Sequence, residues 1–295
     1  MQNSFPKGFP RARIPGMKLL LPTVAAIFLA GCSTPQPTVG GALPTKVYAR
    51  VISLSPSTTE LLSMLLSENV LVGRTSMDTQ PVSISAITIV ANPRPDFEKI
   101  VQLQPDLIIV DLNVINPADL QKLQQLSGPN KFDVVAFKIH SIKDWEDAVW
   151  KLGAMVNQFG EASKHVDFVE ESIRRSKTDP ITPKPRAIVA MGGSRPWVTG
   201  TESFQADAVR GAGGEAVGPA GDKFVPVNPE QIMSWKPDIV FVPDSAGDDY
   251  SSPAWKATKA AIIRVNPDVL LRPGGRVDHL IDGLARELRN SVPSK

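Results

Sequence analysis

Short apolar runs alternate with segments of helical periodicity along the first part of the chain's folded body. Residues 46–54 are rich in β-branched and apolar side chains, which is typical of a strand. Residues 55–66 then switch to helical spacing, and Ser57 and Glu60 are placed as a capping box at the start of that helix. The same patterns predict further strands at residues 106–110 and 132–137 and helices at residues 97–103 and 117–126.

Helical periodicity is sustained through the middle of the chain. It extends over residues 142–178 with an interruption at Gly160, and no strand-like run occurs there. Strands and helices alternate again from residues 186–191 to a final helix over 277–289. Such alternation predicts parallel sheets with both faces covered. We therefore expect an α/β protein with one lobe on each side of a long helix.

One phrase occurs twice, at an offset of 132 residues. FEKIVQLQPDLIIV at residues 97–110 and PEQIMSWKPDIVFV at residues 229–242 both combine a short helix, a Pro-Asp pair and an apolar strand. Glu98 and Glu230 therefore occupy equivalent places near a helix N-terminus. Local physics alone explains a carboxylate there, because it stabilises the helix dipole by about 0.3–1 kcal/mol. Asn228, placed as an N-cap, supports that interpretation.

The first 31 residues have the pattern of a targeting segment. Four basic residues precede an apolar run of about a dozen residues, whereas a helix that spans a bilayer needs roughly 20. The pattern therefore predicts a signal peptide over residues 1–31. Translation can begin at Met1 or at Met17, which a lysine follows.

Cys32 is the only cysteine of the chain and follows Leu29, Ala30 and Gly31. The segment resembles a bacterial lipobox, in which the cysteine is acylated and becomes the mature N-terminus after cleavage. The alternative is an ordinary secretory peptide with an incidental cysteine. Residues 32–46 are rich in Pro, Gly, Ser and Thr, which is typical of a flexible tether.

Charge argues against a nucleic-acid partner. Composition is ordinary for a globular protein, with 42% hydrophobic and 21% charged residues. Removal of residues 1–31 takes away four basic residues and no acidic one, so 28 Lys and Arg face 30 Asp and Glu in the mature chain. A net charge of about −2 gives no basic face that would neutralise phosphates.

The order of several motifs resembles the cobalamin, siderophore and haem family of substrate-binding proteins that serve bacterial ABC importers. The resemblance extends from about Arg50 to Leu288, and its specificity lies in the order and spacing of the motifs. These motifs are RVISLSPSTTELL, FEKIVQLQPDLIIV, RPWVTGTESF, AGGEAVG, VNPEQIMSWKPDIVFV and WKATKAAIIRVNPDVLLRPGGRVDHLIDGLA.

The resemblance implies an α/β fold in which two Rossmann-like lobes with parallel central sheets are joined by a single long α-helix. On this basis we expect an N-terminal lobe over residues 47–140, a helical connector over 141–180 and a C-terminal lobe over 181–295. The ligand is then expected between the lobes, at loops that leave the carboxyl ends of strands.

The family's function implies a lipid-anchored binding protein that captures a corrinoid and delivers it to an ABC permease dimer with its ATPase subunits. Its location would be the periplasm or the outer face of the cytoplasmic membrane, and it would act as a monomer. In the family one acidic residue on each lobe docks into arginine pockets of the permease, and Glu98 and Glu230 match those positions. Charge pairs of this kind set register and association rate.

Candidate ligand-binding residues are taken from the strand-end loops and from positions where cobalamin-binding relatives place contacts. Each of these loops has the alternative of being ordinary surface. The candidates are Ser55, Ser57, Thr58, Met77, Asp78, Asn92, Arg94, Arg195, Trp197, Phe224, Tyr250, Asp268 and Arg272.

The identity of the chelate stays open at this level. Trp197 and Phe224 match positions where cobalamin binders place aromatic rings against the corrin. Met77, Asn92 and Asp111 stand where such relatives carry further aromatics, which weakens the cobalamin interpretation. A corrinoid variant and a ferric siderophore remain alternatives. Haem is less favoured, because the chain has two tyrosines, and Tyr250 is the one expected in a cleft loop.

Two other classes of function have little support. A metal-ion binder would need three or four converging ligands, whereas His140, His165 and His279 are the only histidines and lie far apart in the sequence. An enzyme is not indicated, because the chain has neither a Gly-x-Ser-x-Gly nucleophile motif nor a phosphate-binding glycine loop. We therefore expect no catalytic residue, no resident cofactor and no metal site.

Overall fold

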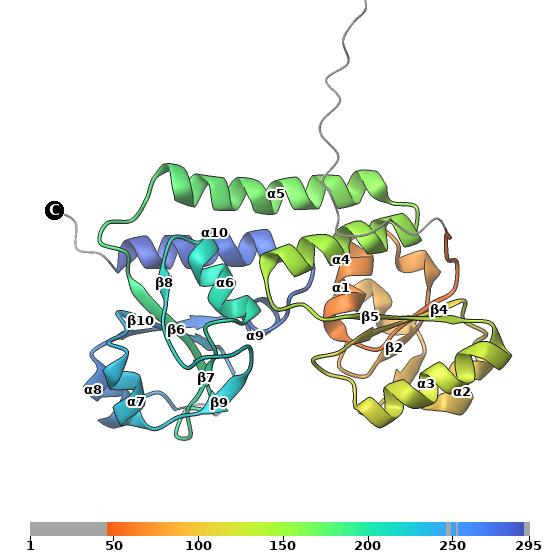
Figure 1. The fold of residues 1–295 in the computed structure, drawn as a ribbon, viewed down its shortest axis with the longest axis horizontal. Helices are drawn as coiled ribbons and strands as arrows, with labels where there is room; N and C mark the ends of the chain where they lie inside the picture. Colours follow the sequence, from red (N-terminus) through yellow and green to blue (C-terminus); the bar gives the residue numbers. More distant parts are fainter. Residues whose placement is uncertain (1–45, 246–248, 252, 292–295) are drawn as a thin grey trace, which may run out of the picture. The chain divides into compact units, whose positions relative to one another are not determined.

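The first sheet has five parallel strands in the order β3-β2-β1-β4-β5. It belongs to a computed structural model that describes residues 46–245, 249–251 and 253–291, all within one compact unit (Figure 1). We call this sheet and its helices the N-terminal lobe. Its strands are β1 (Val51–Ser53), β2 (Leu71–Thr75), β3 (Ile89–Ala91), β4 (Leu107–Asp111) and β5 (Asp133–Phe137).

Helices cover both faces of this sheet because its strands are apolar on both sides. Val51, Leu107 and Ile109 join one buried cluster, whereas Ile52 and Ile108 join another, as the period of two in a strand requires. Helix α1 packs on the first face and α2 and α3 on the second. Their bounds are α1 (Pro56–Met64), α2 (Phe97–Gln102) and α3 (Pro117–Asn130), and the 3₁₀ turns are η1 (Glu68–Val70) and η2 (Val82–Ala86).

The second sheet is mixed, with the order β11-β10-β6-β7-β9 and β8 beside β6. Its parallel part was expected, but β7 runs antiparallel to β6 and to β9. The reason is the short connection after β6, where Gly192 adopts φ +85 and accepts a hydrogen bond from Arg195 N. The strands are β6 (Arg186–Met191), β7 (Trp197–Thr199), β8 (Glu215–Ala216), β9 (Phe224–Pro226), β10 (Ile239–Pro243) and β11 (Ala261–Val265).

Five helices surround this second sheet, and together they form what we call the C-terminal lobe. Ile232 of α7 and Trp255 of α8 pack on one face, whereas Phe204 of α6 and Leu280 of α10 pack on the other. The helices are α6 (Phe204–Gly211), α7 (Pro229–Ser234), α8 (Pro253–Thr258), α9 (Pro267–Leu270) and α10 (Val277–Asn290).

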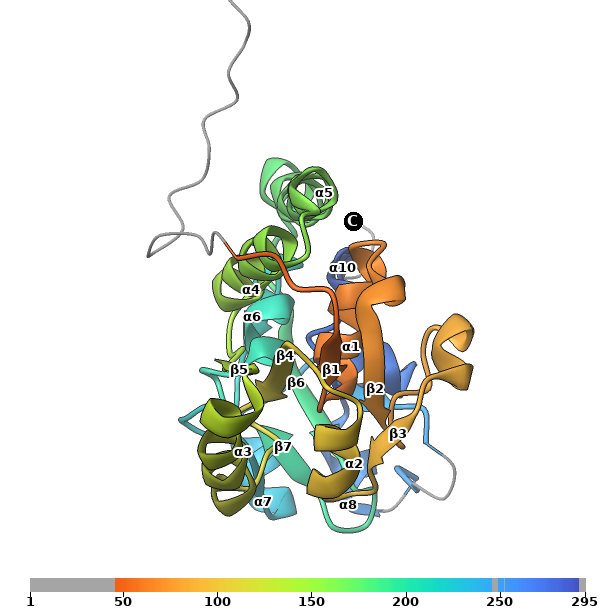
Figure 2. The same ribbon diagram turned by 90° about the vertical axis from the view of Figure 1, so that its right-hand side faces the viewer.

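The connector consists of two helices in place of the single helix expected. These are α4 (Ile142–Met155) and α5 (Phe159–Thr178), and the chain reverses between them at Asn157, which adopts φ 56. Gly153 permits their close approach, because a Cβ built there would lie 2.7 Å from the Ala162 Cβ. Helix α5 provides the long span, and Figures 1 and 2 show α4, α5 and α10 gathered on one side of both sheets.

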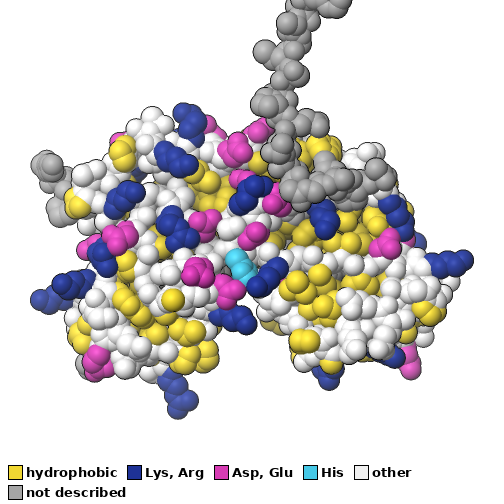
Figure 3. All heavy atoms as spheres, in the orientation of Figure 1, with side chains coloured by type: hydrophobic (Ala, Val, Ile, Leu, Met, Phe, Trp, Pro, Cys, Tyr) yellow, Lys and Arg dark blue, Asp and Glu magenta, His cyan; other side chains and the backbone are white. Residues whose placement is uncertain are grey.

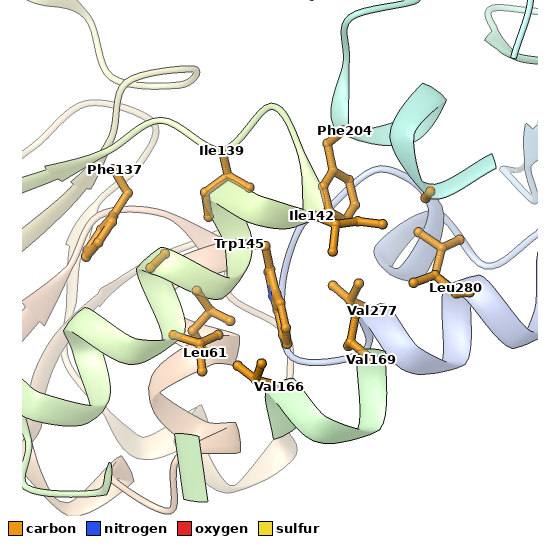
Figure 4. Close-up of a cluster of buried hydrophobic side chains, with 14 of the residues drawn as sticks. Leu61, Phe137, Ile139, Ile142, Trp145, Val166, Val169, Phe204, Val277 and Leu280 are labelled. Carbon is orange, nitrogen blue, oxygen red and sulfur yellow. The ribbon is translucent and has the colours of Figure 1, made fainter. Parts of the chain in front are cut away.

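A shared hydrophobic core joins the lobes through these helices (Figure 4). Leu61 of α1 and Phe204 of α6 contribute to the same cluster as Trp145 of α4, whose side chain is 1% exposed. The Trp145 indole donates to the Gly274 carbonyl at 2.8 Å, which ties α4 to the C-terminal lobe. The expected architecture of two α/β lobes is therefore confirmed, and its hinge is packed rather than open.

Candidate functional site

The duplicated phrase forms equivalent structures in the two lobes. Glu98 and Glu230 are each the second residue of a six-residue helix, α2 and α7, and both are exposed. Asp96 caps α2 by accepting from Lys99 N, and the expected N-cap of α7, Asn228, is confirmed. Neither glutamate makes an ion pair with any residue that the structure describes.

The Pro-Asp pair of each copy has a structural role. Asp106 accepts hydrogen bonds from the Ala49 and Arg50 amides at 2.8 and 2.9 Å, just before β1. Asp238 accepts one from the Arg186 amide at 2.7 Å, at the start of β6. Each aspartate thus fixes the entry of a neighbouring strand.

The same two arginines cap the C-termini of the repeated helices. The Arg50 guanidinium donates to the carbonyls of Leu103 and Gln104 just after α2, and Arg186 donates to the Trp235 carbonyl after α7. Gln104 and its counterpart Lys236 both adopt φ 47. Much of the repeat is therefore explained by folding, but the two exposed glutamates are not part of this bonding.

A cavity of about 620 Å³ lies between the lobes. Its N-terminal wall comes from the loops after β1, β2, β4 and β5, at the carboxyl ends of parallel strands as expected. Figure 3 shows the notch between the lobes, with basic and acidic side chains beside it. The lining is formed by Ser55, Pro56, Ser57, Met77, Asp111, Leu112, Asn113, Val114, Lys138, Ile139, His140, Phe204, Gln205, Asp222, Lys223, Phe224, Leu271, Arg272 and Pro273.

Part of the predicted ligand set lies at this cavity. Ser55 and Ser57 come from the start of α1, Met77 follows β2, and Phe224 and Arg272 come from the C-terminal lobe. Met77 is 59% exposed, so an apolar side chain lies free at the cavity. Both lobes therefore contribute predicted residues to the lining of the same cavity.

Two other predicted residues are committed to internal hydrogen bonds. Thr58 is buried and its hydroxyl lies 2.6 Å from the Ser53 hydroxyl. Asp78 is buried, binds the hydroxyl groups of Thr59 and Thr75, and has a pKa raised by burial. Neither lines the cavity, because both brace the loops around it.

The remaining predicted residues also lie outside the cavity lining. Asn92 accepts from the Ser76 hydroxyl, and Arg94 forms an ion pair with Asp119. Arg195 and Trp197 belong to the turn from β6 to β7, where Trp197 is 41% exposed. Asp268 opens α9 and lies 2.9 Å from Arg272 Nη1, so it reaches the cavity only through that arginine.

Both tyrosines are buried away from the cavity. Tyr250 is 6% exposed and packs edge-on against Trp255 with ring centroids 5.4 Å apart. Tyr48 donates to Asp133 at 2.7 Å, and burial together with this carboxylate raises its pKa to about 12. The expectation that Tyr250 lies in a cleft loop is therefore wrong, because its ring completes a hydrophobic cluster.

Several lining residues were not among the predicted ligand contacts. Lys138 and His140 follow β5, and Asn113 follows β4, so the rule of strand ends would have found them. Asp222 precedes β9 and belongs to an irregular loop without a sequence signal. His140 was expected to be isolated, but it takes part in a network across the cavity.

That network links the two lobes through Asp222. His140 Nδ1 lies 3.1 Å and Lys138 Nζ 3.6 Å from Asp222 Oδ2, and His140 Nε2 lies 2.8 Å from Asn113 Oδ1. Asp144 accepts from the His140 backbone amide at 3.0 Å, which fixes the start of α4 beside it. The imidazole therefore has a defined orientation at one edge of the cavity.

Asp111 lies at the end of β4 and is 4% exposed. Burial raises the pKa of its carboxyl, and the hydrogen bond from the Asn113 amide at 2.8 Å and that from the Ser55 hydroxyl only partly oppose this. The Asp111 carboxyl is thus a buried polar group at the surface of a partly apolar cavity.

A second interlobe cluster forms around Glu60. The sequence predicts this residue as part of a capping box, but α1 starts at Pro56 without a side-chain cap. The Glu60 carboxylate instead binds Arg276 at 2.9 Å and lies 3.7 Å from Arg272. Burial raises its pKa, although both arginines oppose the shift. The capping-box prediction is wrong because Ser55 is the N-cap of α1, so Ser57 and Glu60 already lie inside the helix and not at its N-cap and N3 positions.

Within the described residues no three His, Cys, Asp or Glu side chains are close enough together to hold a metal ion. His165 lies on α5 beside Glu161, and burial lowers its pKa; His279 is largely exposed on α10. The histidines therefore do not converge on one point.

The predictions for the signal peptide, Cys32 and the tether up to residue 45 lie outside the described residues. Among the helices that the structure does describe, none combines the length and the apolar character required for crossing a membrane.

Comparison with known proteins identifies a family and a similar sequence. The model of the family described as periplasmic binding protein matches residues 51–264. A vitamin B12-binding protein of Yersinia pestis (strain Pestoides F) is 27% identical over 287 residues, which cover 93% of this chain and 95% of that protein. The match thus extends over both lobes.

Solved structures share the fold. The periplasmic vitamin B12 binding protein of Vibrio cholerae matches with a TM-score of 0.69 at 21% identity, over 83% of this chain and 98% of that chain. The apo periplasmic haem-binding protein of Roseiflexus sp. RS-1 matches with a TM-score of 0.68 at 19% identity, over 82% and 98%. The fold is thus common to proteins named for different ligands.

Proposed function

The chain belongs to the periplasmic binding protein family, and from this premise we propose that it captures a corrinoid between its lobes for an ABC importer. Membership itself implies a periplasmic location, a small-molecule ligand and an ABC permease as partner. The observation that best supports a corrinoid as the ligand is the similarity to a vitamin B12-binding protein over 93% of the chain. We assign no catalytic role to the cavity residues.

The cavity's size and lining support a ligand that is only partly enclosed. A volume of about 620 Å³ is within the roughly 300–1,000 Å³ of sites that bury a drug-sized ligand. A corrinoid is larger than such a ligand, so part of it would protrude past the exposed side chains of Met77, Leu112 and Val114. Phe224 offers an aromatic face from the opposite lobe.

A ferric siderophore or haem is the second candidate. One observation favours an iron chelate, because the His140 imidazole lines the cavity and could bind iron on releasing Asp222 or Asn113. Tyrosine ligation has no such support, since both tyrosines are buried elsewhere. A bare metal ion is not proposed.

Delivery would depend on an anchor and on two docking points. We propose that residues 1–31 are removed, that Cys32 carries the lipid and that residues 32–46 form the tether. Residues 47–140 and 181–295 would act as lobes and 141–180 as their connector, in a monomer. Glu98 and Glu230 would enter equivalent pockets of the permease.

Calorimetric titration of the chain from Ser33 onward tests the ligand. Cyanocobalamin, a ferric hydroxamate and haemin are titrated in parallel, and tight one-to-one binding of cyanocobalamin is expected. Phe224→Ala should weaken that binding by roughly tenfold to a hundredfold, because it removes an aromatic ring from the cavity. Phe168→Ala, which removes an exposed ring on α5, is the matched control. If only haemin or the ferric hydroxamate gives binding heat, the ligand is an iron chelate and the corrinoid proposal is wrong.

A further inference from the structure

One edge of the interlobe cavity carries a concentration of basic groups. Lys138 and His140 approach it from the end of β5, and Lys223 approaches it from the loop before β9. Lys223 makes no ion pair within the part of the chain that the structure describes. We call these three residues the basic edge.

Asp222 is the acidic partner of this edge. It lies 3.1 Å from His140 Nδ1 and 3.6 Å from Lys138 Nζ, and its side chain is 28% exposed. The second cavity carboxyl, that of Asp111, is buried and bonded to the Asn113 amide. Lys138 and the His140 imidazole therefore share one accessible carboxylate, and Lys223 adds a further positive charge to the same edge.

Arg272, the other basic residue that lines the cavity, already lies beside two carboxylates. Arg272 lies 2.9 Å from Asp268 and 3.7 Å from Glu60, within the interlobe cluster. The excess positive charge is thus confined to the basic edge. A cationic ligand group would be repelled there, and an anionic one would find cations from both lobes at once.

We propose that the basic edge is a subsite for an anionic group on the ligand, a carboxylate or a phosphodiester, which competes with Asp222 for Lys138 and His140. This assignment rests on the proposed function, because it concerns the chelate bound in the same cavity. Lys138 is 53% exposed, so it can turn from Asp222 to the ligand at little cost in desolvation. The His140 ring is held in place by Asn113 at 2.8 Å.

Pairs of probes that differ in this group test the subsite. Haemin is compared with its dimethyl ester, which lacks free carboxylates, and cyanocobalamin with dicyanocobinamide, which lacks the phosphodiester arm. We define charge selectivity as the dissociation constant of the member that lacks the anionic group divided by that of the member that carries it. Selectivity well above one is expected for at least one pair, it should fall as salt is raised, and the pair that shows it identifies the group.

Variants assign the selectivity to named residues. Lys138→Gln with Lys223→Gln should lower it by about tenfold, because two exposed charge contacts with the anionic group are lost. Asp222→Asn should raise it, because the competing carboxylate is gone. The control is Lys122→Gln with Lys184→Gln, two exposed lysines outside the cavity.

A purely structural bridge gives a different result. If Asp222 and the two lysines only hold the lobes together, their replacement changes both members of a pair equally and leaves the selectivity unchanged. That result, or equal binding of both members by the unaltered protein, overturns the subsite and leaves the proposed function standing. Absence of binding by every probe overturns both.

Discussion

Asp111 is a carboxyl group buried at the end of a central strand, with one good hydrogen-bond donor. The Asn113 amide donates at 2.8 Å, whereas the Ser55 hydroxyl lies 3.5 Å away. Burial raises its pKa, so the folded protein holds the proton more tightly than the unfolded chain. Its contribution to stability is therefore greatest at low pH and falls as pH rises from the unfolded pKa of about 3.9 through the raised folded pKa.

Asp111→Asn is expected to remove the loss of stability that ionisation of the buried Asp111 carboxyl causes as pH rises. The amide oxygen can still accept from Asn113, but no charge has to be buried at neutral pH. The free energy of unfolding at pH 7 should rise by about 1 kcal/mol, in the range for imperfectly paired buried polar groups, and the gain should shrink towards pH 4. Urea unfolding at pH 4, 5.5 and 7 measures it, with Asp167→Asn on exposed α5 as control. A loss of stability at pH 7 would contradict the argument.

At the same scale, local position predicts part of the cavity lining, and the resemblance to relatives adds Phe224 and Arg272. Ser55, Ser57 and Met77 follow strands, and strand ends meet at one edge of a parallel sheet. Asp222 meets Lys138 and His140 across the lobes, and no local pattern encodes a contact over such a separation. Tyr250 was misplaced because its burial depends on Trp255, which a loop composition does not show.

At the scale of elements, periodicity predicts most strands and helices but not the break in the connector. Buried residues continue through the turn, where Met155 and Val156 both join the core, so the apolar pattern has no gap there. The chain turns at Asn157, whereas the interruption expected at Gly160 falls in the first turn of α5. The sequence pattern did not predict that β7 is antiparallel either, because the direction of β7 depends on the short connection from β6.

The close contact of α4 with α5 depends on Gly153. A side chain there would meet the Ala162 Cβ at 2.7 Å and the Gln158 carbonyl at 3.2 Å. Gly153→Val should lower the free energy of unfolding by about 1–3 kcal/mol through overpacking. Gly283→Ala in α10 is the opposite case, since no atom of the described residues lies within 4 Å of the new Cβ, and it should stabilise the fold by roughly 0.5–1 kcal/mol. Denaturant midpoints at constant slope distinguish the two, and equal midpoints would refute the packing argument.

At the scale of the whole molecule, the two lobes present the same helix in the same local setting. Arg50 with Asp106, and Arg186 with Asp238, fix α2 and α7 to their strands by the same kinds of hydrogen bond. Folding needs those residues, which accounts for most of the repeated phrase. It does not need an exposed glutamate at the second position of both helices, without an ion pair to any described residue, beyond a modest effect on the helix dipole.

Charge reversal at Glu98 and Glu230 distinguishes docking onto the permease from binding of the ligand. Glu98→Lys with Glu230→Lys should reduce cellular uptake of labelled cobalamin at least tenfold, since like charges would face the permease pockets at both sites. Calorimetric affinity for the ligand should stay unchanged, because neither residue lines the cavity. Asp167→Lys with Glu202→Lys makes the same change in net charge at two other exposed positions and should leave uptake intact. Normal uptake by the first variant would mean that the duplicated glutamates serve only their helices, whereas equal loss in both would point to net charge.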